Sequence, residues 1–198
     1  MIENLDAIRA EIIADPANED FTSLGLVPIY TASKDARIMI VGQAPGRKAQ
    51  ASETPWNDAS GDTLRGWLGV TREVFYDPAI FALVPMDFYY PGKGKQGDLP
   101  PRKGFAEKWH PRILKQMPNI ELIILVGSYA QKYYLGKNVG KSLAETLLQP
   151  ENHSRLYLPL VHPSPLTIGW RARNRWFEGE IVPALKVRIQ EILNPNHS

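Results

Sequence analysis

The chain has 198 residues, a formal net charge of +2 and no cysteine. At this length we expect a single domain over residues 1–198, with a core large enough to need no cross-links. The lack of cysteine excludes disulfides, thiolate nucleophiles and cysteine-ligated clusters. No apolar run reaches the length of a bilayer span, so we expect no membrane partner and a cytoplasmic location.

Hydrophobic periodicity predicts helices and short buried strands in alternation along the chain. The first helix is expected at residues 4–15; its acidic, amphipathic sequence does not resemble a signal peptide. Strands are predicted at residues 36–42, 79–86 and 120–127, and a fourth within 154–166. Further helices are predicted at 60–70, 105–117, 128–136, 141–149 and 170–193, the last one interrupted near Pro183. Because helical crossovers join the strands, we predict an α/β protein, a three-layer α/β/α sandwich around a central, mainly parallel four-stranded sheet.

The segment 87–104 is rich in proline, glycine and lysine and is too long for a simple connection, which makes it a functional candidate. Charge is also distributed unevenly. Residues 1–20 carry six acidic residues against one arginine, whereas residues 91–115 carry seven lysines and arginines against two acids. This asymmetry is compatible with an anionic partner on one face, and equally with a solvated loop.

The predicted strands end in unusual motifs. Ligands of open parallel sheets bind outside the carboxyl ends of the strands, where this chain has GQAPG (42–46), PMDFYYPGKGK (85–95), GSYAQ (127–131) and HPSPL (162–166). A histidine at this edge, His162, can donate a hydrogen bond to a developing anion. Trp56 follows the first motif and is either a stacking platform for a planar ligand or a core residue that anchors its loop.

Several common site types are absent from the sequence. GQAPGRK lacks the spacing and the Lys-Ser/Thr ending of a phosphate-binding Walker motif. No histidine pair or carboxylate cluster has metal-ligand spacing, so we expect neither a metal nor another cofactor. VGSYAQ has the outline of a serine-hydrolase nucleophile turn but lacks its final glycine, which leaves this reaction as a minor alternative.

The motifs GQAPG and HPSPL, in this order, resemble the two signature motifs of the uracil-DNA glycosylase superfamily, and the order of elements fits over roughly residues 36–193. The first motif is similar to the GEAPG form of the family-4 branch, with Gln43 in place of glutamate. The second is similar to the form found in the classical uracil enzymes. The central segment 89–114 also resembles a bacterial subgroup of the superfamily.

The chain departs from the family at three points. It lacks the four cysteines that hold an iron–sulfur cluster in family 4. Ala44 stands where the classical motif has the aspartate that positions the attacking water, although family 4 shares this alanine. Pro85 stands where active relatives have the asparagine that reads the uracil edge, so uracil specificity is in question.

The resemblance implies a monofunctional, monomeric DNA glycosylase of base excision repair. It would act on single- or double-stranded DNA and excise a flipped uracil or another deaminated base. Trp56 and His162 are expected to converge on one slot that takes the base, with Asp87 or the Ala44 carbonyl holding the water. Leu166 or Ile168 would fill the vacated stack, and Arg175 would join the phosphate contacts. The implied sites are catalytic His162, Asp87 and Ala44; base-binding Gly42, Gln43, Trp56 and Phe88; and DNA-binding Ser164, Leu166, Arg171, Arg173, Lys93 and Lys95.

Two other functions fit the sequence. The chain could be a catalytically silent member that binds nucleic acid, or a hydrolase of free nucleosides, which needs no basic face.

Overall fold

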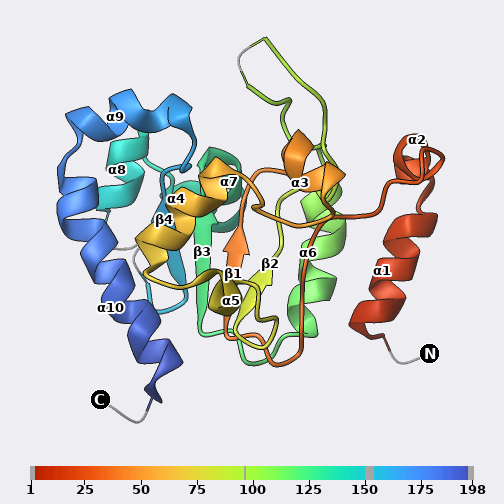
Figure 1. Ribbon diagram of the computed structural model, residues 1–198, viewed down its shortest axis with the longest axis horizontal. Coiled ribbons are helices and arrows are strands. Elements are labelled where there is room, and N and C mark those ends of the chain that lie inside the picture. The colour runs from red at the N-terminus through yellow and green to blue at the C-terminus, as the bar shows by residue number, and fades with distance from the viewer. Residues whose placement is uncertain (1–2, 96, 150–153, 196–198) are drawn as a thin grey trace.

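The computed structural model describes residues 3–95, 97–149 and 154–195. Its centre is a four-stranded, all-parallel sheet in the order β2-β1-β3-β4 (Figure 1). The strands are β1 (Ile38–Val41), β2 (Phe81–Leu83), β3 (Leu122–Val126) and β4 (Tyr157–Leu160). The predicted α/β class and the parallel sheet are therefore confirmed.

Helices cover both faces of the sheet (Figure 1). No helix in the described ranges is long and apolar enough to cross a membrane. The α-helices are α1 (Leu5–Ala14), α2 (Glu19–Thr22), α3 (Arg47–Ala51), α4 (Ala59–Leu68), α5 (Arg72–Phe75), α6 (Phe105–Lys115), α7 (Ser128–Leu135), α8 (Leu143–Leu148), α9 (Ile168–Arg173) and α10 (Val182–Leu193). The 3-10 turns are η1 (Pro16–Asn18), η2 (Gly136–Asn138) and η4 (Pro165–Thr167), and η5 (Phe177–Ile181) is a π-helix.

Alternate strand residues separate the core into two halves. Met39 and Leu125 point to one face, where they pack in a cluster with side chains of α1, α6 and α7. Ile38 and Ile124 point to the other face and pack with side chains of α4, α5 and α10. Because successive side chains of a strand lie on opposite faces, continuous apolar strands need cover on both sides, and three layers result.

Most predicted elements are present, with two kinds of difference. The short helices α2, α3 and α5 were not predicted, because four or five residues are too few to show a helical period. In the last predicted helix, η5 gives way to α10 at Val182, one residue before Pro183, as expected. A second break, at Asn174 between α9 and η5, was not predicted.

Candidate active site

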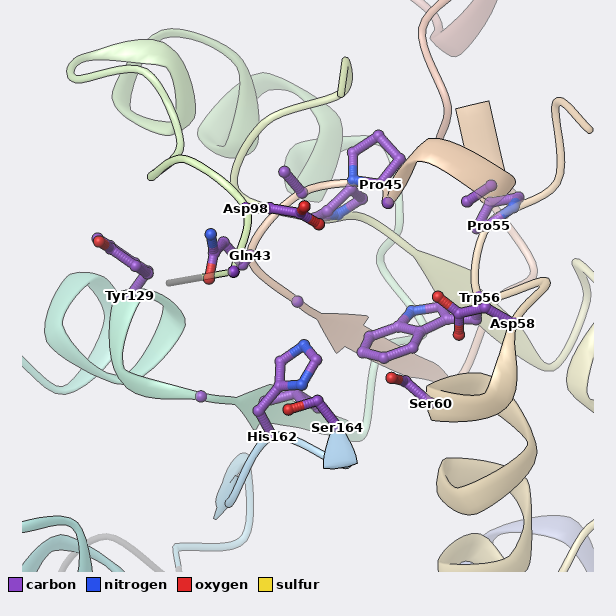
Figure 2. Close-up of a pocket in the computed structure, with 18 of the residues that line it drawn as sticks. Gln43, Pro45, Pro55, Trp56, Asp58, Ser60, Asp98, Tyr129, His162 and Ser164 are labelled. Atoms are coloured by element: carbon purple, nitrogen blue, oxygen red, sulfur yellow. The ribbon is translucent and has the colours of Figure 1, made fainter. Parts of the chain in front are cut away.

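A pocket of about 390 Å³ lies at the carboxyl edge of the sheet. Chain order reverses there between β1 and β3, which is the switch point where open α/β sheets bind ligands. The loops after β1, β3 and β4 all contribute to its wall, together with the segment 55–60 and two residues of a long loop, Gly97 and Asp98 (Figure 2).

The first motif extends the pairing of β1 with β2 into the pocket wall. The carbonyls of Gly42 and Gln43 accept hydrogen bonds from the N–H groups of Met86 (2.8 Å) and Asp87 (3.1 Å). This pairing fixes the backbone of GQAPG, and Gly42, Gln43 and Ala44 all line the pocket. A bare glycine is required at position 42, since an added Cβ would lie 2.7 Å from Cζ2 of Trp56.

The Trp56 loop is held in a strained conformation. Trp56 has φ 57°, in the left-handed region that non-glycine residues rarely adopt. Its carbonyl lies against Gly61 in the first turn of α4, where a Cβ would come within 1.8 Å of the oxygen. The Tyr76 hydroxyl donates to the Pro55 carbonyl at 2.8 Å, and Asp58 caps α4 by accepting from the Gly61 N–H at 2.9 Å. These contacts hold the half-buried indole against Gly42.

The backbone after β4 is fixed beside β3. The Thr167 hydroxyl donates to the His162 carbonyl at 2.8 Å, and the imidazole packs over Gly127, which follows β3 with φ 86°. Burial lowers the pKa of His162, against a smaller opposing effect of the Asp58 and Asp98 carboxylates. The imidazole is therefore neutral at neutral pH and carries one N–H donor.

Trp56 and His162 converge, as expected from the sequence, with ring centroids 5.8 Å apart and ring planes inclined by 32°. A planar ring stacks about 3.5 Å from an aromatic face, so a ring held between two others needs roughly 7 Å. The gap between Trp56 and His162 is too narrow for this arrangement, so the expectation of a slot between the two rings that takes the base is wrong. A flat ligand can stack on the indole with its edge toward the imidazole.

Two pocket carboxylates were missed in the sequence. Asp58 and Asp98 approach from different segments, and a Cβ on Gly46 would lie 3.6 Å from Asp58 Oδ2 and 3.9 Å from Asp98 Oδ2. The sequence signal for Asp58 was its place after Trp56 at a helix N-cap. No local signal marked Asp98, which reaches the pocket only because its loop folds back.

That loop, of which residues 88–95 and 97–101 are described, is called the arm below, and its described part extends beyond the sheet edge (Figure 1). Its two sides are joined by an isolated antiparallel β-bridge between the backbones of Lys93 and Asp98. The Leu99 N–H also donates to the Gly92 carbonyl at 2.9 Å. The Gln43 side-chain amide donates to the Leu99 carbonyl at 2.8 Å. A glutamate at position 43 could not donate this bond, so the departure from the family motif is linked to the arm.

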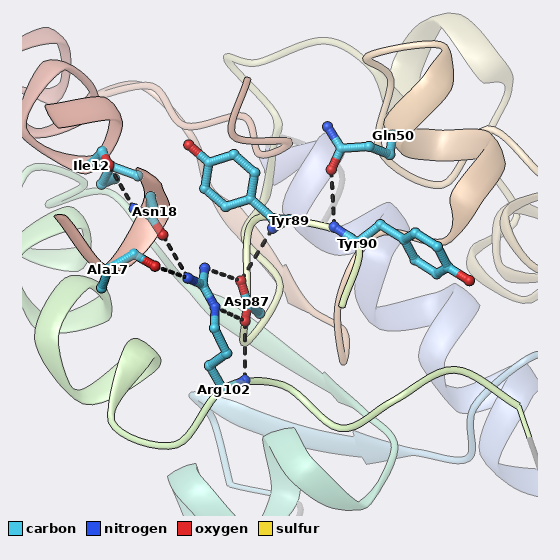
Figure 3. A network of polar contacts seen from close by, with 8 residues as sticks. All are labelled: Ile12, Ala17, Asn18, Gln50, Asp87, Tyr89, Tyr90 and Arg102. Carbon is cyan, nitrogen blue, oxygen red and sulfur yellow. Dashed lines mark hydrogen bonds and ion pairs between the residues drawn. The ribbon is translucent and has the colours of Figure 1, made fainter. Parts of the chain in front are cut away.

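The arm is closed at its base by Asp87 and Arg102 (Figure 3). The guanidinium binds both carboxylate oxygens, with Nε to Oδ2 at 2.7 Å and Nη2 to Oδ1 at 2.8 Å. Asp87 also accepts the N–H groups of Tyr89 and Arg102, while Arg102 donates to the Ala17 carbonyl and to Asn18. The pair fastens the arm to the N-terminal segment.

This placement corrects the roles expected for Asp87 and Phe88. Both side chains are 0% exposed and neither lines the pocket. The Asp87 carboxylate is occupied by Arg102, and Phe88 stacks on Tyr30 at 4.4 Å in the core. Pro85 does line the pocket, and His110 Nε2 contacts its carbonyl at 2.9 Å.

The residues expected to contact DNA differ in availability. Ser164 and Leu166 line the pocket, and Leu166 is 79% exposed at its rim. Lys93 and Lys95 are exposed on the arm. The arginines of the last segment fall into two groups: Arg173 and Arg175 are exposed, whereas Arg171 pairs with Glu178 at 2.8 Å and lies over the Trp67 ring. Ile168, the other candidate for filling the stack, is 55% exposed.

Within the described ranges, no group of three or more histidine, aspartate or glutamate side chains is placed to hold a metal ion. The pocket instead combines a stacking surface, a neutral imidazole and bare backbone at a parallel-sheet switch point. A family model described as the Uracil DNA glycosylase superfamily matches residues 28–186, a range that includes every pocket wall. The chain therefore belongs to the uracil-DNA glycosylase superfamily.

Proposed function

We propose that this protein is a monofunctional DNA glycosylase that hydrolyses the N-glycosidic bond of a flipped, modified base. The observation that carries the proposal is the convergence of Trp56 and His162 in one pocket at the switch point of the sheet. Membership of the family supports the reaction class. A base inside a duplex is out of reach, so the enzyme extrudes it at a cost of a few kcal/mol.

The flipped base stacks on the indole of Trp56. Gly42 has no Cβ and so leaves room for the indole, which places the stacking surface directly beside the first motif. Main-chain amides of Gln43 and its neighbours meet the polar edge of the base. The exposed Leu166 enters the duplex and fills the space that the base leaves.

His162 assists departure of the base. As the bond between C1′ and the base nitrogen breaks, its electron pair moves onto the base, and the imidazole N–H donates a hydrogen bond to the oxygen where negative charge develops. The lowered pKa of His162 keeps the ring neutral, so no proton transfer is required. Loss of one such preorganised donor typically reduces the rate by about 10²–10³.

A water molecule then attacks C1′ of the sugar. Asp87 is not available for this step, because its carboxylate is buried and bound to Arg102. Of the groups that line the pocket, the Asp58 carboxylate and the Ala44 carbonyl are suited to hold the water. Asp58 is fixed by the Gly61 N–H, and it accepts the proton that the water loses.

The proposed substrate is DNA, single- or double-stranded, with a modified base, of which uracil and other deaminated bases are the candidates that the family suggests. The exposed cations Lys93, Lys95 and Arg173 hold its phosphates, and a monomer in the cytoplasm suffices for the reaction. Arg171 contributes less, because Glu178 already occupies its guanidinium.

The test is an excision assay on DNA that contains uracil, hypoxanthine or xanthine, in both strand states. His162→Ala is expected to lose about 10²–10³ in rate. Asn119→Ala, at the opposite edge of the sheet, is the matched control and should retain the wild-type rate. Equal rates for the two variants would contradict the role of His162.

A second candidate is a silent family member that binds DNA without excision. Pro85 favours it, because it lacks the side-chain amide that active relatives carry at that position. Salt-dependent duplex binding without release of any base would support this candidate. A hydrolase of free nucleosides would instead release base from nucleosides and show no duplex binding.

A further inference from the structure

Among the described residues that line the pocket, the charged side chains are two carboxylates, beside neutral hydroxyl groups that can donate as well as accept. No lysine or arginine is among the described residues that line it. One N–H of the Gln43 amide is committed to the Leu99 carbonyl of the arm, which orients this side chain in the pocket wall. Asp58 and Asp98 add carboxylates, and His162 contributes a single N–H.

The two carboxylates are solvated in the free protein, since Asp98 is exposed and Asp58 half-buried, and a ligand that fills the pocket would displace that water. Neither Asp58 nor Asp98 forms an ion pair with a described lysine or arginine. One oxygen of Asp58 caps α4, and one oxygen of Asp98 is 3.4 Å from the Tyr90 hydroxyl. The second oxygen of each is directed toward Gly46, a pocket residue. A neutral ligand would shield these charges from water without balancing them.

We infer that the pocket selects a base that carries positive charge and an amino group, such as an N-alkylated purine, and that Asp98 confers this selectivity. The inference rests on the proposed glycosylase function. The positive charge balances the carboxylates, and the amino group donates to Asp98. The electron-rich face of Trp56 attracts a cationic ring more strongly than a neutral one. His162 adds no opposing charge, because its lowered pKa keeps it neutral.

Uracil fits this set of groups poorly. It presents two carbonyl oxygens and one N–H, so it needs donors on two sides. The main-chain amides of the first motif can meet one side of uracil, but Pro85 has no side-chain amide for the other side, and the Asp98 carboxylate would repel a carbonyl oxygen placed against it. Asp98 belongs to the arm. The contacts that Gln43 and Arg102 make with the arm and its base therefore help to position Asp98 for selecting the base.

The reaction balances without a co-reactant other than water. The bond from C1′ to the alkylated base breaks, and its electron pair neutralises the cationic ring, which leaves as a neutral base. Water forms the new bond to C1′, and its proton passes to Asp58 and then to solvent.

The experiment compares four substrates in duplex DNA. Release of 7-methylguanine and 3-methyladenine from methylated DNA is measured by chromatography, corrected for enzyme-free loss, beside release of uracil and hypoxanthine. The proteins are wild type, Asp98→Asn and, as a control, Glu107→Gln, which removes an exposed carboxylate of α6 outside the pocket. Melting temperatures establish that all three fold.

The wild type and Glu107→Gln should release the two methylated bases at least about tenfold faster than the uncharged ones, and Asp98→Asn should reduce that ratio about tenfold. Methylated bases released no faster than uracil, or an unchanged ratio in Asp98→Asn, would overturn the inference while the glycosylase function stands. No release of any base by the wild type would overturn the proposed function itself.

Discussion

The side chain of Trp56 and the backbone of Gly42 meet without room for another atom. Trp56 adopts a positive φ of 57° and rests on a residue that has no Cβ. Strained conformations of this kind persist where the surrounding structure enforces them, and they gather at functional sites. The position of the indole is therefore set by two close contacts: Gly42 lies against the ring, and Gly61 lies against the Trp56 backbone.

Gly42→Ala is expected to displace the indole, because its Cβ would lie 2.7 Å from Cζ2. A shift of the stacking surface by about 1 Å costs roughly 10² in the rate of base release. Gly66→Ala is the matched control, since nothing lies within 4 Å of its added Cβ. Single-turnover rates would decide, and a Gly42→Ala enzyme as fast as Gly66→Ala would show that the indole position does not matter.

Because His110 is buried, the stability of the protein is expected to depend on pH. Burial lowers its pKa from 6.5 to about 4, so between these values the unfolded chain binds a proton that the folded chain does not. The contribution of neutral His110 to the free energy of unfolding is complete above pH 6.5. Roughly 3 kcal/mol of that free energy is lost as the pH falls to 4. Denaturant titrations of wild type and His110→Asn should show a smaller pH dependence in the variant. Parallel curves over pH 4–6.5 would contradict this assignment.

Single residues were predicted with mixed success. His162 and Trp56 could be found because short motifs place them directly after a strand or its loop. Asp87 was misplaced because sequence position at a strand end does not reveal whether a carboxylate meets solvent or an arginine fifteen residues later. Asp98 required the arm to fold back, which no local pattern encodes.

At the scale of elements, the arm depends on the contact at its base. Asp87 is fully buried, and Arg102 is its charge partner. Arg102 also donates a hydrogen bond to Asn18, which connects the base of the arm to η1. Arg102→Ala would leave a buried carboxylate unpaired, a change that typically costs about 3–5 kcal/mol.

A double-mutant cycle with Arg102→Ala, Asp87→Asn and the combined variant separates charge from packing. Asp87→Asn in the Arg102→Ala background should restore part of the lost unfolding free energy, because it removes the unpaired charge. If the losses of unfolding free energy in the two single variants add up to the loss in the double variant, the two side chains do not act as a pair.

Elements with a clear apolar pattern could be predicted from the sequence, and elements without one could not. The strands and α1, α4, α6 and α7 have an apolar period that local reading detects. The π-helix η5 and the break at Asn174 have no such signal, since tertiary packing of Trp176 and Phe177 accompanies them. The three-layer arrangement followed from the alternation of helices with continuous apolar strands.

At the scale of the whole molecule, the pocket, the arm and Leu166 all lie at the carboxyl edge of the sheet. The net charge is only +2, so DNA binding depends on where the cations lie. Lys93 and Lys95 project from the arm, and the exposed Arg173 lies at the end of α9.

Duplex binding is therefore expected to weaken steeply with salt. Replacing both Lys93 and Lys95 by alanine should reduce the slope of log K against log salt by about two, with one unit for each lost phosphate contact. Lys34→Ala, a highly exposed lysine before β1, is the control and should leave the slope unchanged. An unchanged slope in the double variant would exclude the arm from the DNA interface.

The central claim, that one flipped base stacks on Trp56 with its edge at His162, is tested most directly by a structure of the complex. A duplex with a 2′-fluoro nucleotide, which resists cleavage, would trap the bound state. In that complex we expect the base to lie on the indole, within hydrogen-bond distance of the imidazole and out of the helical stack. A base still stacked in the duplex, or seated away from Trp56, would contradict it.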